Sequence, residues 1–231
     1  MLKISNLEAW YGKLHIIKNI SLDIQKGSFV SIIWPNWSWK STLLKSIVWL
    51  TTISKWKISF LRKDITNLKT YKYIKYWISY VKQTENIFPK LTVKENLEIA
   101  WATLDPEIYK KNLSEVFQLF PTLLKECDKI AWLLSWWQRQ ILAIGMAYLH
   151  KPKLLLLDEP TAWLSPKSIN AVFNVINKIH TDGVTIVIVE HNVKKILEYC
   201  TDIIILKDGK IAISAPREEL DDEKIKDIYF N

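Results

Sequence analysis

Glycine is scarce in this chain, which has only five among its 231 residues. An average usage of about 7% predicts roughly 16 glycines in a chain of this length. Cysteine is scarcer still, because Cys127 and Cys200 are the only two and they lie far apart. This excludes a disulfide-rich scaffold and a cysteine-based metal site, so we expect two buried free thiols.

Long hydrophobic runs are also missing. No apolar stretch approaches the ~20 residues needed to span a bilayer, and the start, MLKISNLEAW, lacks the apolar core of a signal peptide. With 49% hydrophobic and 24% charged residues, the chain has the composition of a globular protein with one sizeable domain, or one domain with a subdomain. We expect a soluble, cytoplasmic protein.

Acidic residues are few between Lys55 and Gln83, where Asp64 stands against eight lysines and arginines, and the formal charge of the whole chain is +8. Such a stretch indicates either an anionic partner, nucleic acid or a membrane surface, or a solvated lysine-rich face. We favour the solvated face and expect no nucleic acid partner. Lysine, isoleucine and asparagine are all plentiful and have AT-rich codons, so the lysine excess can reflect the genome.

Tryptophan is abundant where glycine is missing. The chain has 12 tryptophans and 5 glycines, which together make 17, close to the expected number of glycines. Several stand where the backbone favours glycine. Trp49 follows a predicted helix at the position where a left-handed glycine often ends helices. Trp10 and Trp56 stand in turn-like stretches, Trp77 directly precedes the strand-like ISYVKQ, and Trp163 follows LLLLDEPTA.

Two explanations remain open for these tryptophans. One is a tryptophan-rich core, the usual meaning of repeated aromatic residues. The other is a decoding artefact, in which the gene uses UGA for glycine and the sequence was translated with a table that reads UGA as tryptophan. We favour the second, because the tryptophans follow loop and turn signals and have no helical or strand period.

A phosphate-binding loop is predicted in SIIWPNWSWKST, residues 31–42. The pattern G-x-x-x-x-G-K-[ST] fits if Trp34 and Trp39 are read as glycines. Glycine lets backbone N–H groups approach phosphate oxygens, and the following helix directs the positive end of its dipole toward them. We expect Lys40 to reach the β- and γ-phosphates and Ser41 to ligate Mg²⁺. The predicted loop comprises Trp34, Pro35, Asn36, Trp37, Ser38, Trp39, Lys40, Ser41 and Thr42.

Two acids follow a predicted buried strand in KLLLLDEP, residues 153–160. Four consecutive leucines are typical of a strand covered on both faces of a parallel sheet. Ligands bind at the carboxyl ends of such strands. We therefore expect Asp158 to help hold Mg²⁺ and Glu159 to orient and deprotonate the attacking water.

With these motifs in this order, the chain resembles the ATP-binding subunit of an ABC transporter almost from end to end. LLSWWQRQ resembles the family signature L-S-G-G-Q, which the resemblance implies contacts ATP bound to a second subunit, through Ser135, Trp136, Trp137 and Gln138. Gln83 matches the glutamine that senses Mg²⁺ and water and couples to the membrane domains. His191 matches the histidine that contacts the γ-phosphate, and Tyr11 the aromatic residue that stacks on adenine. Ser165, in TAWLSP, stands where many members have aspartate.

The resemblance implies a fold as well as a site. We expect an α/β P-loop NTPase (RecA-like) core with an antiparallel β-subdomain, in a single ABC ATPase domain over residues 1–231. An inserted helical subdomain is expected over about 84–134. LTVKENLEIAWATL and NLSEVFQLFPTLL have helical periods, and Thr92 with Glu95 predicts a capping box. The tail from Ala215 is expected to be one charged helix.

The resulting hypothesis is an ATPase motor subunit on the inner face of the cell membrane, with ATP and Mg²⁺ as its ligands. Its expected partners are transmembrane permease subunits and a second ATP-binding subunit, identical or related. The signature helix and the segment FPTLLKE resemble those of branched-chain amino acid importers. The alternatives are a non-transport ABC protein and, if the tryptophans are real, a catalytically dead scaffold.

Overall fold

The computed structural model describes residues 1–34, 40–102, 105–221 and 225, with the backbone alone at Tyr11, Lys40, Ser54 and Lys55. The chain forms two compact units. Unit 1 comprises Met1–Tyr73, Leu156–Asp158 and Thr185–Asn231, and unit 2 comprises Ile74–Leu155 and Glu159–Val184.

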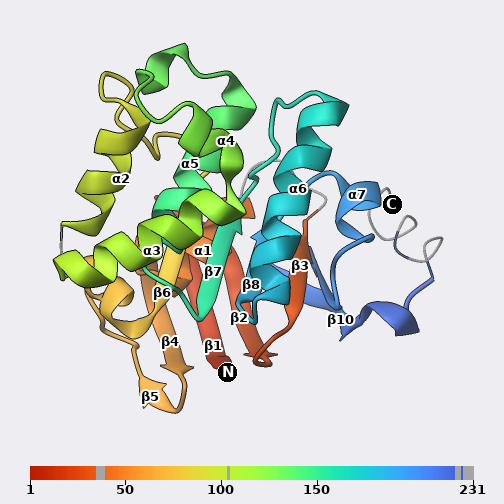
Figure 1. Cartoon of the computed structure of the whole chain (residues 1–231). Coiled ribbons are helices and arrows are strands. Elements are labelled where there is room, and N and C mark those ends of the chain that lie inside the picture. Colours follow the sequence, from red (N-terminus) through yellow and green to blue (C-terminus); the bar gives the residue numbers. More distant parts are fainter. Residues whose placement is uncertain (35–39, 103–104, 222–224, 226–231) are drawn as a thin grey trace. The chain divides into compact units, whose positions relative to one another are not determined.

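Unit 1 contains an antiparallel sheet with strand order β2-β1-β4-β5. The strands are β1 (Leu2–Tyr11), β2 (Leu14–Ile24), β4 (Thr52–Phe60) and β5 (Lys63–Asp64) (Figure 1). Such a sheet matches the antiparallel part of the expected P-loop NTPase fold. The turn prediction for Trp10 and Trp56 was wrong, because both lie inside strands. Trp10 pairs with His15 and Thr52 on either side of β1.

The second sheet of unit 1 is mainly parallel. Its strands are β3 (Phe29–Ile33), β8 (Thr185–Val189), β9 (Asp202–Lys207) and β10 (Lys210–Pro216), in the order β10-β9-β3-β8. β3 pairs in parallel with both β8 and β9, and β10 adds an antiparallel edge. All residues of β3 and β8 are buried, as expected for strands with both faces covered. The parallel core predicted from the sequence is thus confirmed.

One tight approach joins the two sheets of unit 1. Gly209 lies in the turn between β9 and β10 with φ of 81°, and its carbonyl accepts a hydrogen bond from the backbone N–H of Lys18. A Cβ atom at Gly209 would lie 2.2 Å from the Ile16 carbonyl oxygen. Glycine is therefore required at Gly209 for packing as well as for backbone conformation.

Unit 1 also contains the helices α1 (Lys40–Ile47) and α7 (Val193–Ile196) and the 3-10 turn η3 (Arg217–Glu219). α1 begins at Lys40, as the phosphate-loop pattern predicts. The tail differs from the expected single helix, because Ala215 and Pro216 end β10 and pair with Ile203 and Asp202. The 3-10 turn η1 (Thr70–Tyr76) continues from unit 1 into unit 2.

Unit 2 is mainly helical and is organised around α5 (Trp136–Tyr148), which packs against α2, α4 and α6 (Figure 1). Gly145 lies close to α4, and a Cβ atom there would lie 2.8 Å from Leu123 Cδ1, the end of a flexible side chain. β7 (Leu154–Asp158) begins in this unit next to β6, and its last three residues belong to unit 1, next to β8. The other elements of unit 2 are β6 (Ile78–Val81), α2 (Val93–Trp101), α3 (Pro106–Leu119), α4 (Pro121–Lys125), η2 (Ala131–Leu133) and α6 (Pro166–Thr181).

The predicted start of α2 is confirmed in detail. The Thr92 side chain accepts a hydrogen bond from the backbone N–H of Glu95, and the Glu95 carboxylate accepts one from the backbone N–H of Thr92. Asn96 is fully buried. Its side chain accepts a hydrogen bond from the Phe88 backbone N–H and donates one to the Phe88 carbonyl, which fixes the loop before α2. The boundaries of a helical subdomain at about 84–134 remain a prediction.

Three tryptophans have the backbone conformation that favours glycine. The φ angles are 57° at Trp49, 58° at Trp77 and 61° at Trp163. Their side chains are 40%, 45% and 69% exposed. These are positions where turn signals in the sequence predicted glycine, and the side chains do not form a core.

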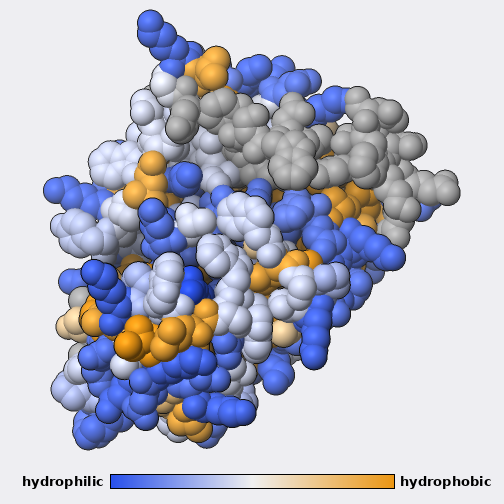
Figure 2. Space-filling view, turned by 90° about the horizontal axis from the view of Figure 1, so that it is seen from above, coloured by the Kyte–Doolittle hydropathy of each residue, from blue (hydrophilic) through white to orange (hydrophobic). Residues whose placement is uncertain are grey.

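The surface shown in Figure 2 is largely hydrophilic, with separate hydrophobic areas. Within the described ranges, no helix is long and apolar enough to cross a membrane. Cys200 is buried, as predicted, whereas Cys127 is only partly buried.

Candidate functional site

The carboxyl ends of three strands carry the predicted functional residues of unit 1. β3 leads toward α1, β8 leads to His191, and β7 ends at Asp158. β3 and β8 pair in register from Phe29 with Ile186 to Ile32 with Val189, so both end at the same edge of the sheet. This is the edge at which open α/β sheets bind their ligands.

The predicted phosphate loop is described at its two ends. Trp34, 3% exposed, follows β3, and Thr42, 5% exposed, lies in the first turn of α1. Ser41 is half-buried between Lys40 and Thr42. The remaining loop residues, 35–39, lie outside the described residues, as do the side chains of Tyr11 and Lys40.

The Asp158 carboxylate is 1% exposed at the end of β7. A buried carboxylate requires a compensating partner of opposite charge or hydrogen-bond donors. Carboxylate and hydroxyl oxygens, such as those of Asp158 and Ser41, are the hard ligands that Mg²⁺ prefers, usually beside substrate phosphates and water. Among the described residues there is no cluster of three or more His, Cys, Asp or Glu side chains. The oxygens of Asp158 and Ser41 fit a magnesium ion that is also held by phosphate oxygens and water.

His191 follows β8 by two residues, and its side chain is 32% exposed. The residue between them, Glu190, is fully buried. One of its carboxylate oxygens, Oε2, accepts hydrogen bonds from the backbone N–H groups of His191 (3.0 Å) and Asn192 (3.3 Å). Glu190 was not among the residues predicted from the sequence. An acid placed directly after the five buried residues TIVIV was the signal that could have revealed it.

In unit 2, two predicted residues far apart in sequence form a direct contact. The Gln83 side-chain amide donates a hydrogen bond of 2.9 Å from Nε2 to Glu159 Oε2. Glu159 has φ of 45°, a left-handed conformation that is uncommon outside glycine. Backbone strain of this kind clusters at functional sites. The residues predicted to sense and to activate the attacking water thus meet.

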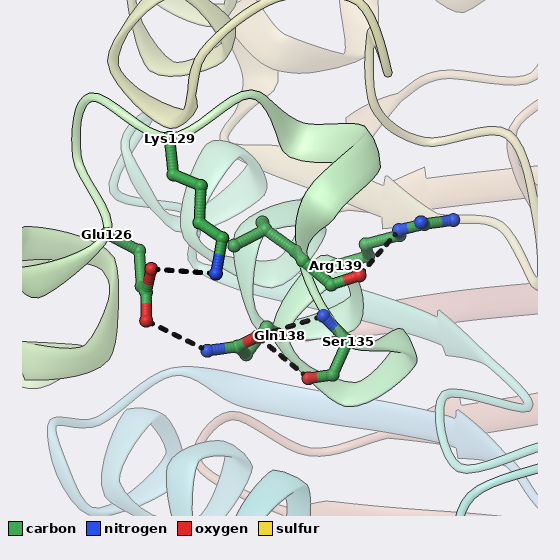
Figure 3. Close-up of polar contacts among 6 residues, drawn as sticks. Glu126, Lys129, Ser135, Gln138 and Arg139 are labelled. Carbon is green, nitrogen blue, oxygen red and sulfur yellow. Dashed lines mark hydrogen bonds and ion pairs between the residues drawn. The ribbon is translucent and has the colours of Figure 1, made fainter.

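The predicted signature segment forms the start of α5 (Figure 3). The Gln138 Oε1 atom accepts hydrogen bonds from the Ser135 backbone N–H (2.9 Å) and hydroxyl (2.8 Å). Gln138 also donates to Glu126, which forms an ion pair with Lys129. These contacts hold the first turn of α5, whose backbone N–H groups form the positive end of the helix dipole.

Neither tryptophan of the signature segment is fully buried. Trp136 is 49% exposed and Trp137 is half-buried. The Trp136 ring meets Trp163 edge to face, with centroids 6.2 Å apart. In the same region, the Arg139 guanidinium lies 4.8 Å from the centroid of Trp132.

Ser165 caps α6, since its side chain accepts a hydrogen bond from the backbone N–H of Ser168. The hydroxyl therefore has a local structural role at the start of α6.

Comparison with known families agrees with this arrangement. Residues 17–162 match the family model described as "ABC transporter". This chain belongs to the ABC transporter family.

Two curated relatives of this ABC protein are ATP-binding proteins of amino acid transport. The chain is 39% identical to the probable branched-chain amino acid transport ATP-binding protein LivF of Archaeoglobus fulgidus, over 95% of this chain and 94% of the relative. It is 31% identical to the high-affinity branched-chain amino acid transport ATP-binding protein BraG of Pseudomonas aeruginosa, over 100% and 99%. The lipopolysaccharide export system ATP-binding protein LptB of Haemophilus influenzae also matches, at 29% identity over 100% and 97%.

Solved cassettes share the fold. The ADP conformation of MJ1267, an ATP-binding cassette of an ABC transporter, matches with a TM-score of 0.88 and 27% identity, over 100% of this chain and 98% of that one. The expected P-loop NTPase fold is confirmed, and this ABC protein is an ATPase.

A groove lies beside Gln83 in unit 2 of this ABC ATPase, with a volume of about 260 Å³. Its lining is mainly apolar and comes from the segment after β6 and from one face of η2 and α5. The lining residues are Gln83, Thr84, Glu85, Asn86, Ile87, Pro89, Trp132, Trp136, Arg139, Gln140 and Ala143. Gln83 thus both borders the groove and contacts Glu159.

Proposed function

We propose that this chain is the ATP-hydrolysing subunit of an importer of branched-chain amino acids. The observation that carries the substrate class is the 39% identity to LivF across nearly the full length of both chains. BraG and a LivG relative from Methanocaldococcus jannaschii, at 29% identity, support the same class. The chain is also 29% identical to LptB, a protein of lipopolysaccharide export, so a different transported substrate is the competing hypothesis.

We propose the following roles in ATP binding and hydrolysis. The segment from Trp34 to Thr42 holds the phosphates, Lys40 contacts the β- and γ-phosphates, and Tyr11 stacks on adenine. Glu159 deprotonates the attacking water and His191 contacts the γ-phosphate. Catalysis is then mainly positioning together with electrostatic stabilisation of the transferring phosphoryl group.

Magnesium is the cofactor that this donor set fits. Ser41 and Asp158 would hold the ion, with the side-chain oxygen of Gln83 as a third ligand. The ion would neutralise the charge that develops on the phosphate oxygens. The Gln83 amide N–H contacts Glu159, so the same side chain would link the ligand set to the base.

The proposed partners are a second ATP-binding subunit and transmembrane permease subunits. The start of α5, with Ser135, Trp136, Trp137 and Gln138, would contact ATP bound to the second subunit. Among similar structures, the cassette MJ0796 is dimeric. The groove beside Gln83 would receive a permease segment, because movement there reaches Glu159 through one hydrogen bond. A membrane-bound partner would hold the subunit at the inner face of the cell membrane.

We also propose that the twelve tryptophans are glycines in the natural protein. Support comes from the left-handed backbone at Trp49, Trp77 and Trp163, and from the exposure of all three side chains. The signature and phosphate-loop patterns also require glycine at Trp136, Trp137, Trp34 and Trp39. UGG codons at these positions would refute the proposal, and the chain would then be a candidate for the catalytically dead scaffold.

A transport assay tests the substrate class. The subunit would be co-expressed with the membrane subunits encoded beside its gene, purified as a complex and placed in liposomes. We expect leucine, isoleucine or valine, with the matching binding protein, to stimulate ATP hydrolysis and to be taken up. Glutamate serves as the matched control and should do neither. Association with no membrane subunit would favour a non-transport ABC ATPase, whereas stimulation by a different solute would overturn only the substrate.

A further inference from the structure

Glu190 is a buried acid of unit 1, next to His191 in the chain, and the roles proposed above do not include it. Glu190 is 0% exposed and directly follows β8, whose five residues are all buried. A charged carboxylate in such surroundings is strongly unfavourable unless hydrogen-bond donors surround it. Two of those donors are the backbone N–H groups of His191 and Asn192, both bonded to Oε2.

These bonds determine the course of the chain at His191. Glu190 holds the turn from its amino-terminal side. On the other side, the Asn192 side chain accepts a hydrogen bond of 3.2 Å from the Lys195 backbone N–H and so caps α7. The backbone that carries the histidine is thus fixed by a carboxylate before it and a helix cap after it.

The same oxygen also lies near the imidazole ring. His191 Nδ1 lies 3.5 Å from Glu190 Oε2. In a neutral imidazole, the group that one nitrogen faces decides which nitrogen carries the proton. A carboxylate beside Nδ1 favours a proton on Nδ1, and the Nε2 edge of the ring is then directed away from Glu190.

We propose that Glu190 is a positioning residue for ATP hydrolysis: its carboxylate fixes the turn and the Nδ1 edge of His191, so that Nε2, which must itself carry a proton to donate to a phosphate oxygen, is the atom presented to the nucleotide. Glu190 itself touches neither nucleotide nor water in this proposal. The inference rests on the role in ATP hydrolysis proposed above for His191.

The variant Glu190→Gln tests the proposal with little change of volume. Its amide oxygen, in the place of Oε2, would still accept from the backbone N–H groups and lie beside Nδ1, but without the negative charge it would favour a proton on Nδ1 less strongly. We expect kcat to fall by about tenfold, the lower end of the loss seen when the partner of a metal-bound histidine is removed. The KM for ATP should be unchanged, because most of the nucleotide contacts remain.

Nitrogen NMR of the imidazole separates positioning from simple stability. The chain has four histidines, and a His191→Gln variant assigns the signals of His191 by their disappearance. In the full parent chain, under alkaline conditions where the ring is neutral, we expect Nδ1 to be protonated. In Glu190→Gln a larger share of the rings should carry the proton on Nε2. A parent protein with the proton on Nε2 overturns the proposal without reference to any variant.

Thr185→Val is the matched control at the opposite end of β8. Thr185 is 1% exposed and accepts a hydrogen bond of 2.9 Å from the Gly27 backbone N–H, so its loss should lower Tm. We expect the His191 signals and kcat per folded protein to stay at parent values in this control. If Glu190→Gln behaves in the same way, Glu190 is only structural and the inference fails.

A separate measurement tests the role of His191 in ATP hydrolysis, on which this inference rests. If His191→Gln hydrolyses ATP at the parent rate, the proposed role of the histidine is wrong, whatever the NMR signals of Glu190→Gln show.

Discussion

Glu159 combines a strained backbone with a hydrogen bond to Gln83. If its carboxylate accepts the proton of the attacking water, the change Glu159→Gln should nearly stop turnover while ATP binding persists, because the amide keeps the size but cannot act as a base. ATP turnover and binding are measured on the same preparation, and sizing chromatography should reveal a stable ATP-bound dimer. Hydrolysis at the parent rate would point to a different base.

Lys40 begins α1 immediately after the predicted phosphate loop. The change Lys40→Ala should abolish ATP binding or hydrolysis, since the phosphates lose a positively charged partner. Lys45→Ala, in the last turn of the same helix, is the matched control and should retain both. Equal activity of the two variants would contradict the assignment of the phosphate loop.

The two thiols should differ in reactivity. Cys200 is 7% exposed, and burial raises the pKa of its thiol to about 11. Burial also raises the pKa of the Cys127 thiol, but this residue is only partly buried and remains accessible. Because the thiolate is the reactive form, we expect one thiol per folded chain to react with a thiol reagent at neutral to mildly alkaline pH. Cys200 should react only after unfolding. A Cys127→Ser variant identifies the reactive group, and rapid labelling of that variant would contradict the burial of Cys200.

At the scale of elements, two substitutions at the start of α2 should lower the free energy of unfolding by different amounts. Thr92→Ala removes one side of the capping box and should lower the free energy of unfolding by about 1 kcal/mol. Asn96→Ala leaves the buried N–H and carbonyl of Phe88 without their partner and should cost about 1–3 kcal/mol. Urea denaturation measures both, and a larger loss for Thr92→Ala would contradict the importance of the buried bonds. Lys94→Ala, exposed on the same helix, should have little effect.

Local sequence signals predicted some elements well and misjudged others. The capping residues of α2, the start of α1 and the buried leucines of β7 were confirmed because their determinants lie within a few residues. Trp10 and Trp56 were wrongly expected in turns, because strand pairing with distant segments decides their conformation. The end of β10 was missed for the same reason, since Ala215 and Pro216 pair with β9.

At the scale of the whole molecule, the tryptophans determine whether the chain can fold and bind ATP. A residue other than glycine at a left-handed position costs roughly 1–2 kcal/mol. Trp49, Trp77 and Trp163 together would then cost roughly 3–6 kcal/mol, a large part of a typical total stability of ~5–15 kcal/mol. Overpacking around Trp34 would add to this loss.

Paired expression therefore gives a decisive prediction. The chain with tryptophan at all twelve positions should be insoluble or molten and should not bind ATP, whereas the chain with glycine at all twelve should be soluble and active. Thermal unfolding and ATP binding are compared under identical conditions. If the tryptophan form folds cooperatively and binds ATP, both the glycine proposal and the account of the phosphate loop are wrong.

The members of the candidate site could be predicted from motif order, but their geometry could not. Gln83 and Glu159 are 76 positions apart, and nothing local to either indicates a direct contact. Glu190 was missed because its signal, an acid directly after TIVIV, also fits the start of a solvated loop until the burial of the side chain is known. The sequence indicates the chemistry of a site, whereas tertiary packing determines which groups touch.

The bond between Gln83 and Glu159 has a consequence for the cell's ATP pool. If Glu159 is the base, the hydrogen bond from Gln83 stabilises its charged carboxylate and makes it a weaker proton acceptor for as long as the bond is held. A hydrogen bond to a charged group contributes about 1.5–3 kcal/mol, so an isolated subunit in this state would idle roughly ten to a hundred times more slowly than one with the bond broken. The cell would then hold many copies of the subunit with little loss of ATP, since rapid consumption would begin only when a partner breaks this one hydrogen bond.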